Sequence, residues 1–107
     1  MTKHDISVST RVGLELLNNK WYALILTNLT ADFSDFMILR KKIRGISTLN
    51  LLLALTKLIS LGLVADDDEY AYRLLHDGVE MQHILFSLHD WGKQQLKALG
   101  AVTKRGK

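Results

Sequence analysis

The sequence predicts a mainly helical protein with one small β-hairpin, and three observations support this. The chain has no proline and no cysteine, which favours uninterrupted helices and excludes a disulfide framework, a thiolate metal site and a thiol redox switch. Hydrophobic residues make up 48% of it and charged residues 23%, so it can form a core and disorder is excluded as its main state. The length of 107 residues suits a single domain over residues 1–107.

Two helices are expected before residue 30. The first covers about residues 9–18 and ends at the Asn18-Asn19 pair, with Ser7, Ser9 and Thr10 as candidate caps. The second covers about residues 20–29, where apolar side chains recur at helical spacing.

A third and a fourth helix follow, with a short turn between them. Candidate caps for a helix over about residues 35–43 are Asp32, Ser34 and Asp35, and Gly45 ends this helix. Ser47 can cap the next helix, over about residues 48–61. Two helices joined by a short glycine-containing turn have the spacing of a helix-turn-helix.

A hairpin is expected after the fourth helix. Short β-type runs at residues 63–65 and 70–74 flank the acidic run Asp66–Glu69. The acidic run is itself readily explained as a soluble turn.

The last helix is expected over about residues 78–99, with a frayed basic tail after it. Asp77 and Glu80 have the spacing of a capping box at its start. The predicted order of elements is therefore α-α-α-α-β-β-α, which is the arrangement of a winged helix-turn-helix.

Charge is segregated along the chain. The formal net charge is only +3, but Arg40, Lys41, Lys42 and Arg44 lie next to the predicted turn. Such a cluster is either a solvated helix end or a set of phosphate contacts. The residues alone leave both interpretations open.

Several short motifs together carry a family resemblance over about residues 9–96. They are Asn19-Lys20-Trp21, Phe36-x-x-Leu39, Gly45-Ile46-Ser47, Leu51 with Leu55 and Leu58, Gly62-Leu63-Val64, Tyr72-x-Leu74, Gly78 and Trp91-Gly92. In this order the chain resembles the HxlR-type winged helix-turn-helix transcriptional regulators, relatives of the MarR group. The resemblance implies a homodimer, held by the first and last helices, that binds double-stranded DNA with its fourth helix in the major groove.

The resemblance also implies roles for individual residues. Phosphate contacts are expected from Lys20, Arg40, Lys41, Lys42 and Arg44. Base contacts are expected from Thr48, Asn50, Thr56 and Lys57. The dimer interface is expected to include Val12, Leu16, Met81, Leu85, Leu88 and Trp91.

Two features depart from the family pattern and favour an alternative. Leu49, Leu52 and Leu53 occupy a face of the fourth helix that is polar in the family, and apolar side chains cannot supply bidentate hydrogen bonds to bases. The hairpin is short and acidic, and its carboxylates oppose phosphate binding. The alternative is a winged-helix protein-interaction module that has lost DNA binding, with the three leucines as its partner surface.

A third hypothesis is a small-molecule sensor with a pocket lined by Trp21, Tyr22, Phe86 and Trp91. A plain dimer core explains these aromatic residues equally well. The sequence identifies no effector.

We expect no enzyme, no cofactor and no metal site. Glu80 and His83 lie three residues apart with His76 nearby, but no second such pair completes a site, so surface histidines are the better interpretation. No phosphate-binding glycine loop or nucleophile elbow is found. Polar residues interrupt the most hydrophobic stretch, Leu49–Ala65, and the N-terminus lacks the pattern of a signal peptide, so we expect a cytoplasmic protein without a membrane span.

Overall fold

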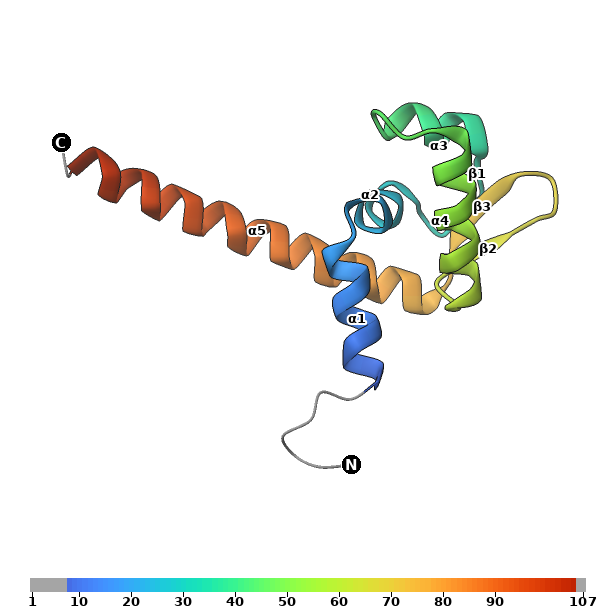
Figure 1. Cartoon of the computed structure of the whole chain (residues 1–107), viewed down its shortest axis with the longest axis horizontal. Helices are drawn as coiled ribbons and strands as arrows, with labels where there is room; N and C mark the ends of the chain where they lie inside the picture. The colour runs from blue at the N-terminus through green and yellow to red at the C-terminus, as the bar shows by residue number, and fades with distance from the viewer. Residues whose placement is uncertain (1–7, 106–107) are drawn as a thin grey trace.

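A computed structural model describes the backbone of residues 8–105 and the side chains of residues 11 and 13–100. It contains five helices and a three-stranded antiparallel sheet (Figure 1). The elements are α1 (Val8–Asn18), α2 (Lys20–Asn28), β1 (Ser34–Asp35), α3 (Phe36–Lys42), α4 (Thr48–Ser60), β2 (Val64–Asp66), β3 (Ala71–Leu74) and α5 (His76–Arg105). The predicted mainly helical winged fold is confirmed, with one additional strand.

Asn19 separates the first two helices. Its side-chain Oδ1 accepts hydrogen bonds from the backbone N–H groups of Trp21 at 3.0 Å and Tyr22 at 3.3 Å. These are donors that the first turn of a helix leaves without partners. Asn19 is therefore the N-cap of α2 as well as the residue that interrupts the two helices.

The additional strand, β1, is too short to be found from sequence. The sheet order is β1-β3-β2, and Ser34 and Asp35 pair with Tyr72 and Ala71 of the hairpin. The Phe36 N–H donates to the Tyr70 carbonyl at 2.8 Å and extends this connection. The hairpin is thereby attached to the segment that leads into α3.

Helix α5 is longer at both ends than predicted. It begins at His76, and the Val79 N–H donates to the Leu75 carbonyl at 3.0 Å, so Asp77 lies inside the first turn instead of capping it. It continues to Arg105 through the region where fraying was expected. A single internal glycine such as Gly100 costs only about 1 kcal/mol relative to alanine, which does not oblige a helix to end.

The hydrophobic core surrounds α2. Its side chains Ile25, Leu26 and Leu29 are almost completely buried. The other core side chains are Leu16, Phe36, Leu39, Ile43, Ile46, Leu51, Ala54, Leu55, Leu58, Leu63, Val64, Tyr72 and Leu74. Among the described side chains, no polar or charged residue is buried with them. Packing of apolar faces therefore fixes where α3 and α4 lie.

Gln82 joins α5 to the end of α2. Its Nε2 donates to the carbonyl oxygens of Leu26 and Leu29, both at 2.8 Å. Because both carbonyls lie at the C-terminal end of α2, they lack the partners that a helix interior supplies. We expect Gln82→Ala to lower the free energy of unfolding by about 2 kcal/mol, since two part-buried acceptors lose their donor. Chemical denaturation measures this change.

Gln94 provides the matched control on the same helix. It is exposed, and Gln94→Ala is expected to change stability by less than about 0.5 kcal/mol. Equal effects of the two substitutions would contradict the role given to Gln82.

Candidate nucleic-acid interface

The turn between α3 and α4 has the local geometry that its sequence predicts. The side chain of Asp35 caps α3 by accepting from the Met37 N–H at 2.9 Å. Gly45 has a φ of +83°, a backbone conformation that favours glycine. The Ser47 hydroxyl then caps α4 by accepting from the Asn50 N–H at 3.0 Å. The turn therefore holds the last turn of α3 against the start of α4.

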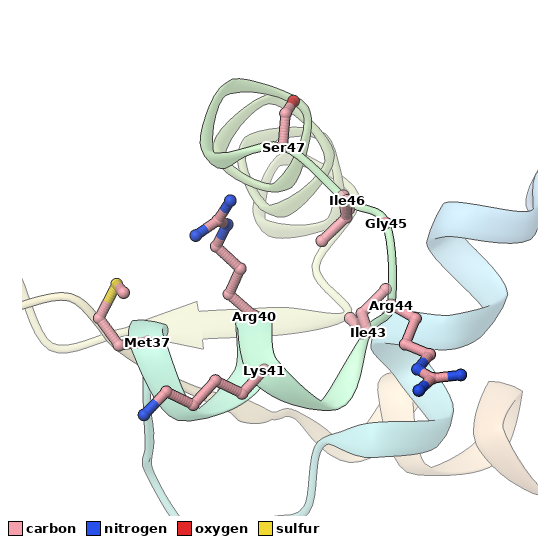
Figure 2. Close-up of a pocket in the computed structure, with 8 residues that line it drawn as sticks. All are labelled: Met37, Arg40, Lys41, Ile43, Arg44, Gly45, Ile46 and Ser47. Carbon is pink, nitrogen blue, oxygen red and sulfur yellow. The ribbon is translucent and has the colours of Figure 1, made fainter.

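The four basic residues of the predicted cluster surround this turn. Arg40, Lys41 and Arg44 line much of an open hollow of about 450 Å³, together with Met37, Ile43, Gly45, Ile46 and Ser47. Figure 2 shows that Arg40 extends from α3 toward the start of α4, whereas Lys41 and Arg44 diverge from it. Lys42 is exposed on the same last turn of α3. The basic cluster is thus gathered on one part of the surface.

No acidic side chain neutralises the cluster within the described residues. Over residues 8–105 one salt bridge forms, between His76 and Glu80, and it is far along the chain from these basic residues. The Nε of Arg40 is buried and has no hydrogen-bond partner within the described structure. Lys41, Lys42 and Arg44 are exposed, so their charges are accessible to an anionic partner.

Helix α4 presents a mixed face to solvent. Its inner side is buried, and Leu52 is half-buried against the core. The exposed residues between positions 48 and 57 are Thr48, Leu49, Asn50, Leu53, Thr56 and Lys57. All four predicted base-contacting residues are therefore at the surface, whereas only Leu49 and Leu53 of the three leucines are.

Lys20 is exposed at the start of α2. Its Nζ is 4.5 Å from the centre of the Trp21 ring. Trp21 and Asn19 help line a small hollow whose other wall is formed by Asn50 and Leu53 of α4. Lys20 itself is exposed but is not among the residues that line this hollow.

The hairpin is acidic and tightly turned. Asp67 Oδ1 accepts from the N–H groups of Glu69 at 2.8 Å and Ala71 at 3.1 Å. Asp68 and Tyr70 both have positive φ values, 65° and 63°, which the short turn imposes. Burial, and after it the charge of Asp66, raise the pKa of Tyr72 above its ordinary value. The wing therefore carries negative charge on the same domain as the basic turn.

The predicted dimer residues fall into three groups. The side chain of Val12 lies outside the described part. Leu16 is in the core of its own chain, and Met81 and Leu85 are half-buried against that core. Leu88 and Trp91 are exposed, with 47% and 62% of their surfaces accessible.

The exposed apolar residues continue along α5. Ile84, Phe86 and Leu96 are also exposed. In Figure 1 the C-terminal half of this helix extends away from the other elements. None of the described helices is apolar over a length that would cross a bilayer.

The aromatic residues considered for a small-molecule pocket do not share one. Trp21 and Tyr22 line the hollow beside α4, whereas Trp91 lines a separate shallow apolar depression on α5. Phe86 is exposed.

Potential metal ligands meet at the start of α5. Atoms of His76, Asp77 and Glu80 lie within 4.8 Å of one another, and all three residues are exposed. His76 Nε2 is 2.9 Å from Glu80 Oε1, a pairing one turn apart on the helix. His83, which the sequence placed near a possible site, lies outside this group. The pairing accounts for the arrangement without an ion.

Sequence and structure comparisons place the chain among known proteins. A family model described as HxlR-like helix-turn-helix matches residues 16–99. No curated protein matches the sequence significantly.

Solved structures with the same fold come from bacteria and an archaeon. A regulator assigned to the MarR family from Enterococcus faecalis V583 superposes with a TM-score of 0.77 at 22% identity, covering 94% of this chain and 97% of that one. A possible HxlR family transcriptional factor from Thermoplasma volcanium GSS1 gives a TM-score of 0.69 at 27% identity, with 86% and 87% covered. The regulator ytfH of Salmonella typhimurium gives 0.69 at 25% identity, with 89% and 90% covered.

Proposed function

The chain belongs to the HxlR-like helix-turn-helix family of transcriptional regulators, and from that premise we propose that it binds double-stranded DNA as a homodimer. The observation that carries the proposal is the placement of the basic cluster. Arg40, Lys41, Lys42 and Arg44 surround the turn that begins α4, and no acid of the described residues pairs with them. A helix exposed beside such a cluster is suited to the major groove, and the basic side chains can then contact the flanking phosphates.

The acidic hairpin, which is the wing of this fold, indicates that the electrostatic affinity for DNA comes from other elements. Four carboxylates near the phosphate backbone oppose association, and the α3–α4 turn has to overcome this repulsion. We therefore propose that Lys20 and the basic cluster supply most of the electrostatic affinity. We propose base-edge contacts for the four exposed polar residues of α4, which are Thr48, Asn50, Thr56 and Lys57.

The dimer proposal rests on α5. Leu88 and Trp91 are large apolar side chains exposed on a helix that extends beyond its own core. A row of exposed apolar residues along one helix is typical of an interaction surface. A two-fold dimer through α5 presents two α4 helices to two half-sites of the DNA. We propose that the protein acts in the cytoplasm, where its DNA is.

Salt dependence tests the phosphate contacts. We expect the double substitution Lys41→Gln and Lys42→Gln to weaken binding to random-sequence duplex DNA and to reduce the log–log salt slope by about two, because two fewer counterions are released. Fluorescence anisotropy titrations over a range of salt concentrations measure the slope.

Lys93→Gln with Lys97→Gln is the control, because it removes the same charge from exposed positions on α5. We expect it to leave the slope close to that of the unmodified protein. If both pairs change the slope equally, the contribution is one of net charge and the α3–α4 turn is not the site.

A further inference from the structure

The exposed face of α4 contains an apolar stripe. Leu49 and Leu53 have 64% and 59% of their surfaces accessible. With Thr56 they follow an i, i+4, i+7 spacing, which places all three on one side of a helix. Leu52 is not part of the stripe, because it packs against the core.

The hydroxyl of Thr56 is occupied inside the helix. Its Oγ1 donates to the Leu52 carbonyl at 2.8 Å. Residue 56 therefore offers chiefly its methyl group to a partner. The stripe is accordingly apolar over its whole length, which is about 10 Å for the helical rise from residue 49 to residue 56.

The surroundings of the stripe indicate which partner it fits. Lys57 is exposed one position after Thr56, and the basic turn lies before Leu49. Positive charge at both ends of an apolar stripe complements the phosphates that border a major groove, in which the thymine methyl groups are the apolar features. The length of the stripe corresponds to about three base pairs at 3.4 Å each.

Asn50 independently favours A·T base pairs. It is exposed beside Leu49, and it is the backbone N–H of Asn50 that bonds to the Ser47 cap, so its side-chain amide stays at the surface. Asparagine binds adenine through two hydrogen bonds in the major groove. Adenine pairs with thymine, so the amide and the leucines are both satisfied by A·T base pairs.

We infer that Leu49, Leu53 and Thr56 recognise thymine methyl groups, so that each half-site of the preferred DNA contains a short A·T-rich run. This inference rests on the proposed function and adds the class of DNA sequence that α4 selects. Methyl contacts then add to the hydrogen bonds that Asn50 and the other polar residues of α4 make with base edges.

Replacing thymine with uracil tests the inference, because it removes only the methyl group. Duplexes are first selected by the protein from a random-sequence pool, and the enriched duplex is then synthesised with deoxythymidine or with deoxyuridine. We expect the enriched duplex to be A·T-rich. We expect uracil to weaken binding about three- to fourfold for each buried methyl group, or roughly tenfold or more over a half-site.

Variants of α4 assign the effect to the stripe. With Leu49→Ala and Leu53→Ala combined, the ratio of thymine to uracil affinities should fall toward one. Lys57→Ala is the control, and it should weaken binding to both duplexes equally and leave their ratio unchanged. Thermal unfolding followed by circular dichroism verifies that these surface variants fold, because none of the three residues belongs to the core.

The outcomes separate this inference from the proposed function. An enriched duplex that binds equally well with uracil overturns methyl recognition and leaves DNA binding intact. A protein that retains no duplex even at low salt overturns both, and the leucines then form a surface for a protein partner.

Discussion

Alanine in place of Gly78 is expected to lower the free energy of unfolding by about 2–3 kcal/mol, although alanine is the better helix former. A Cβ on residue 78 would overlap the carbonyl oxygen of Leu63, and it would lie 3.1 Å from the Leu63 carbonyl carbon and 3.2 Å from Leu74 Cδ2. The Leu63 oxygen accepts from the Leu75 N–H at 2.9 Å. It therefore cannot move aside without weakening the connection between the hairpin and α5.

Gly92 on the same helix is the matched control. A Cβ there meets nothing within 4 Å, so Gly92→Ala is expected to stabilise the protein by up to about 1 kcal/mol. Urea denaturation of the two variants should give changes of opposite sign. A Gly78→Ala variant as stable as the unmodified protein would contradict the close approach of α5 to Leu63.

Acidic residues on α5 are expected to separate the proposed dimer. Leu88→Glu with Trp91→Glu puts two carboxylates into the proposed interface, where burial without a partner is strongly unfavourable. We expect a monomer by sedimentation, and DNA affinity lower by about a hundredfold or more, because one chain can no longer hold its partner at the second half-site.

Ile38→Glu controls for the addition of an acid to an exposed apolar position. Ile38 is 53% exposed on α3, away from α5. That variant should remain a dimer by sedimentation. A double α5 variant that still sediments as a dimer would show that the interface lies elsewhere.

The helix-turn-helix was predictable because local chemistry determines its ends. Ser47 is the cap that the sequence indicated for α4, and Asp35 is one of the three candidates for α3. Gly45 takes the positive φ expected after α3. Strand β1 was not predictable, because it consists of two residues that are extended only through pairing with the hairpin. The start of α5 was predicted too late for a related reason. The Leu75 carbonyl accepts the first helical hydrogen bond, from the Val79 N–H, directly after strand β3 has ended.

Side-chain accessibility was the less predictable part of the candidate site. Leu49, Leu52 and Leu53 are alike in sequence, but Leu52 turns toward the core and the other two do not. Leu16 shows the same limit, since its apolar character indicates burial without saying whether its own core or a partner covers it. The hydrogen bonds of Gln82 could not be predicted from the neighbouring sequence, because its acceptors lie more than 50 residues earlier in the chain.

The attachment of α5 at one end has a geometric consequence. Its first turns are fixed to the body of the protein at Gly78 and Gln82, and the whole helix is about 45 Å long. In the proposed dimer, the crossing angle of the two α5 helices therefore sets both the separation and the relative rotation of the two α4 helices. Each residue added to the middle of α5 would rotate the C-terminal half of the helix by about 100° relative to the domain. The phase of one helix thus limits which operator spacings the protein can span.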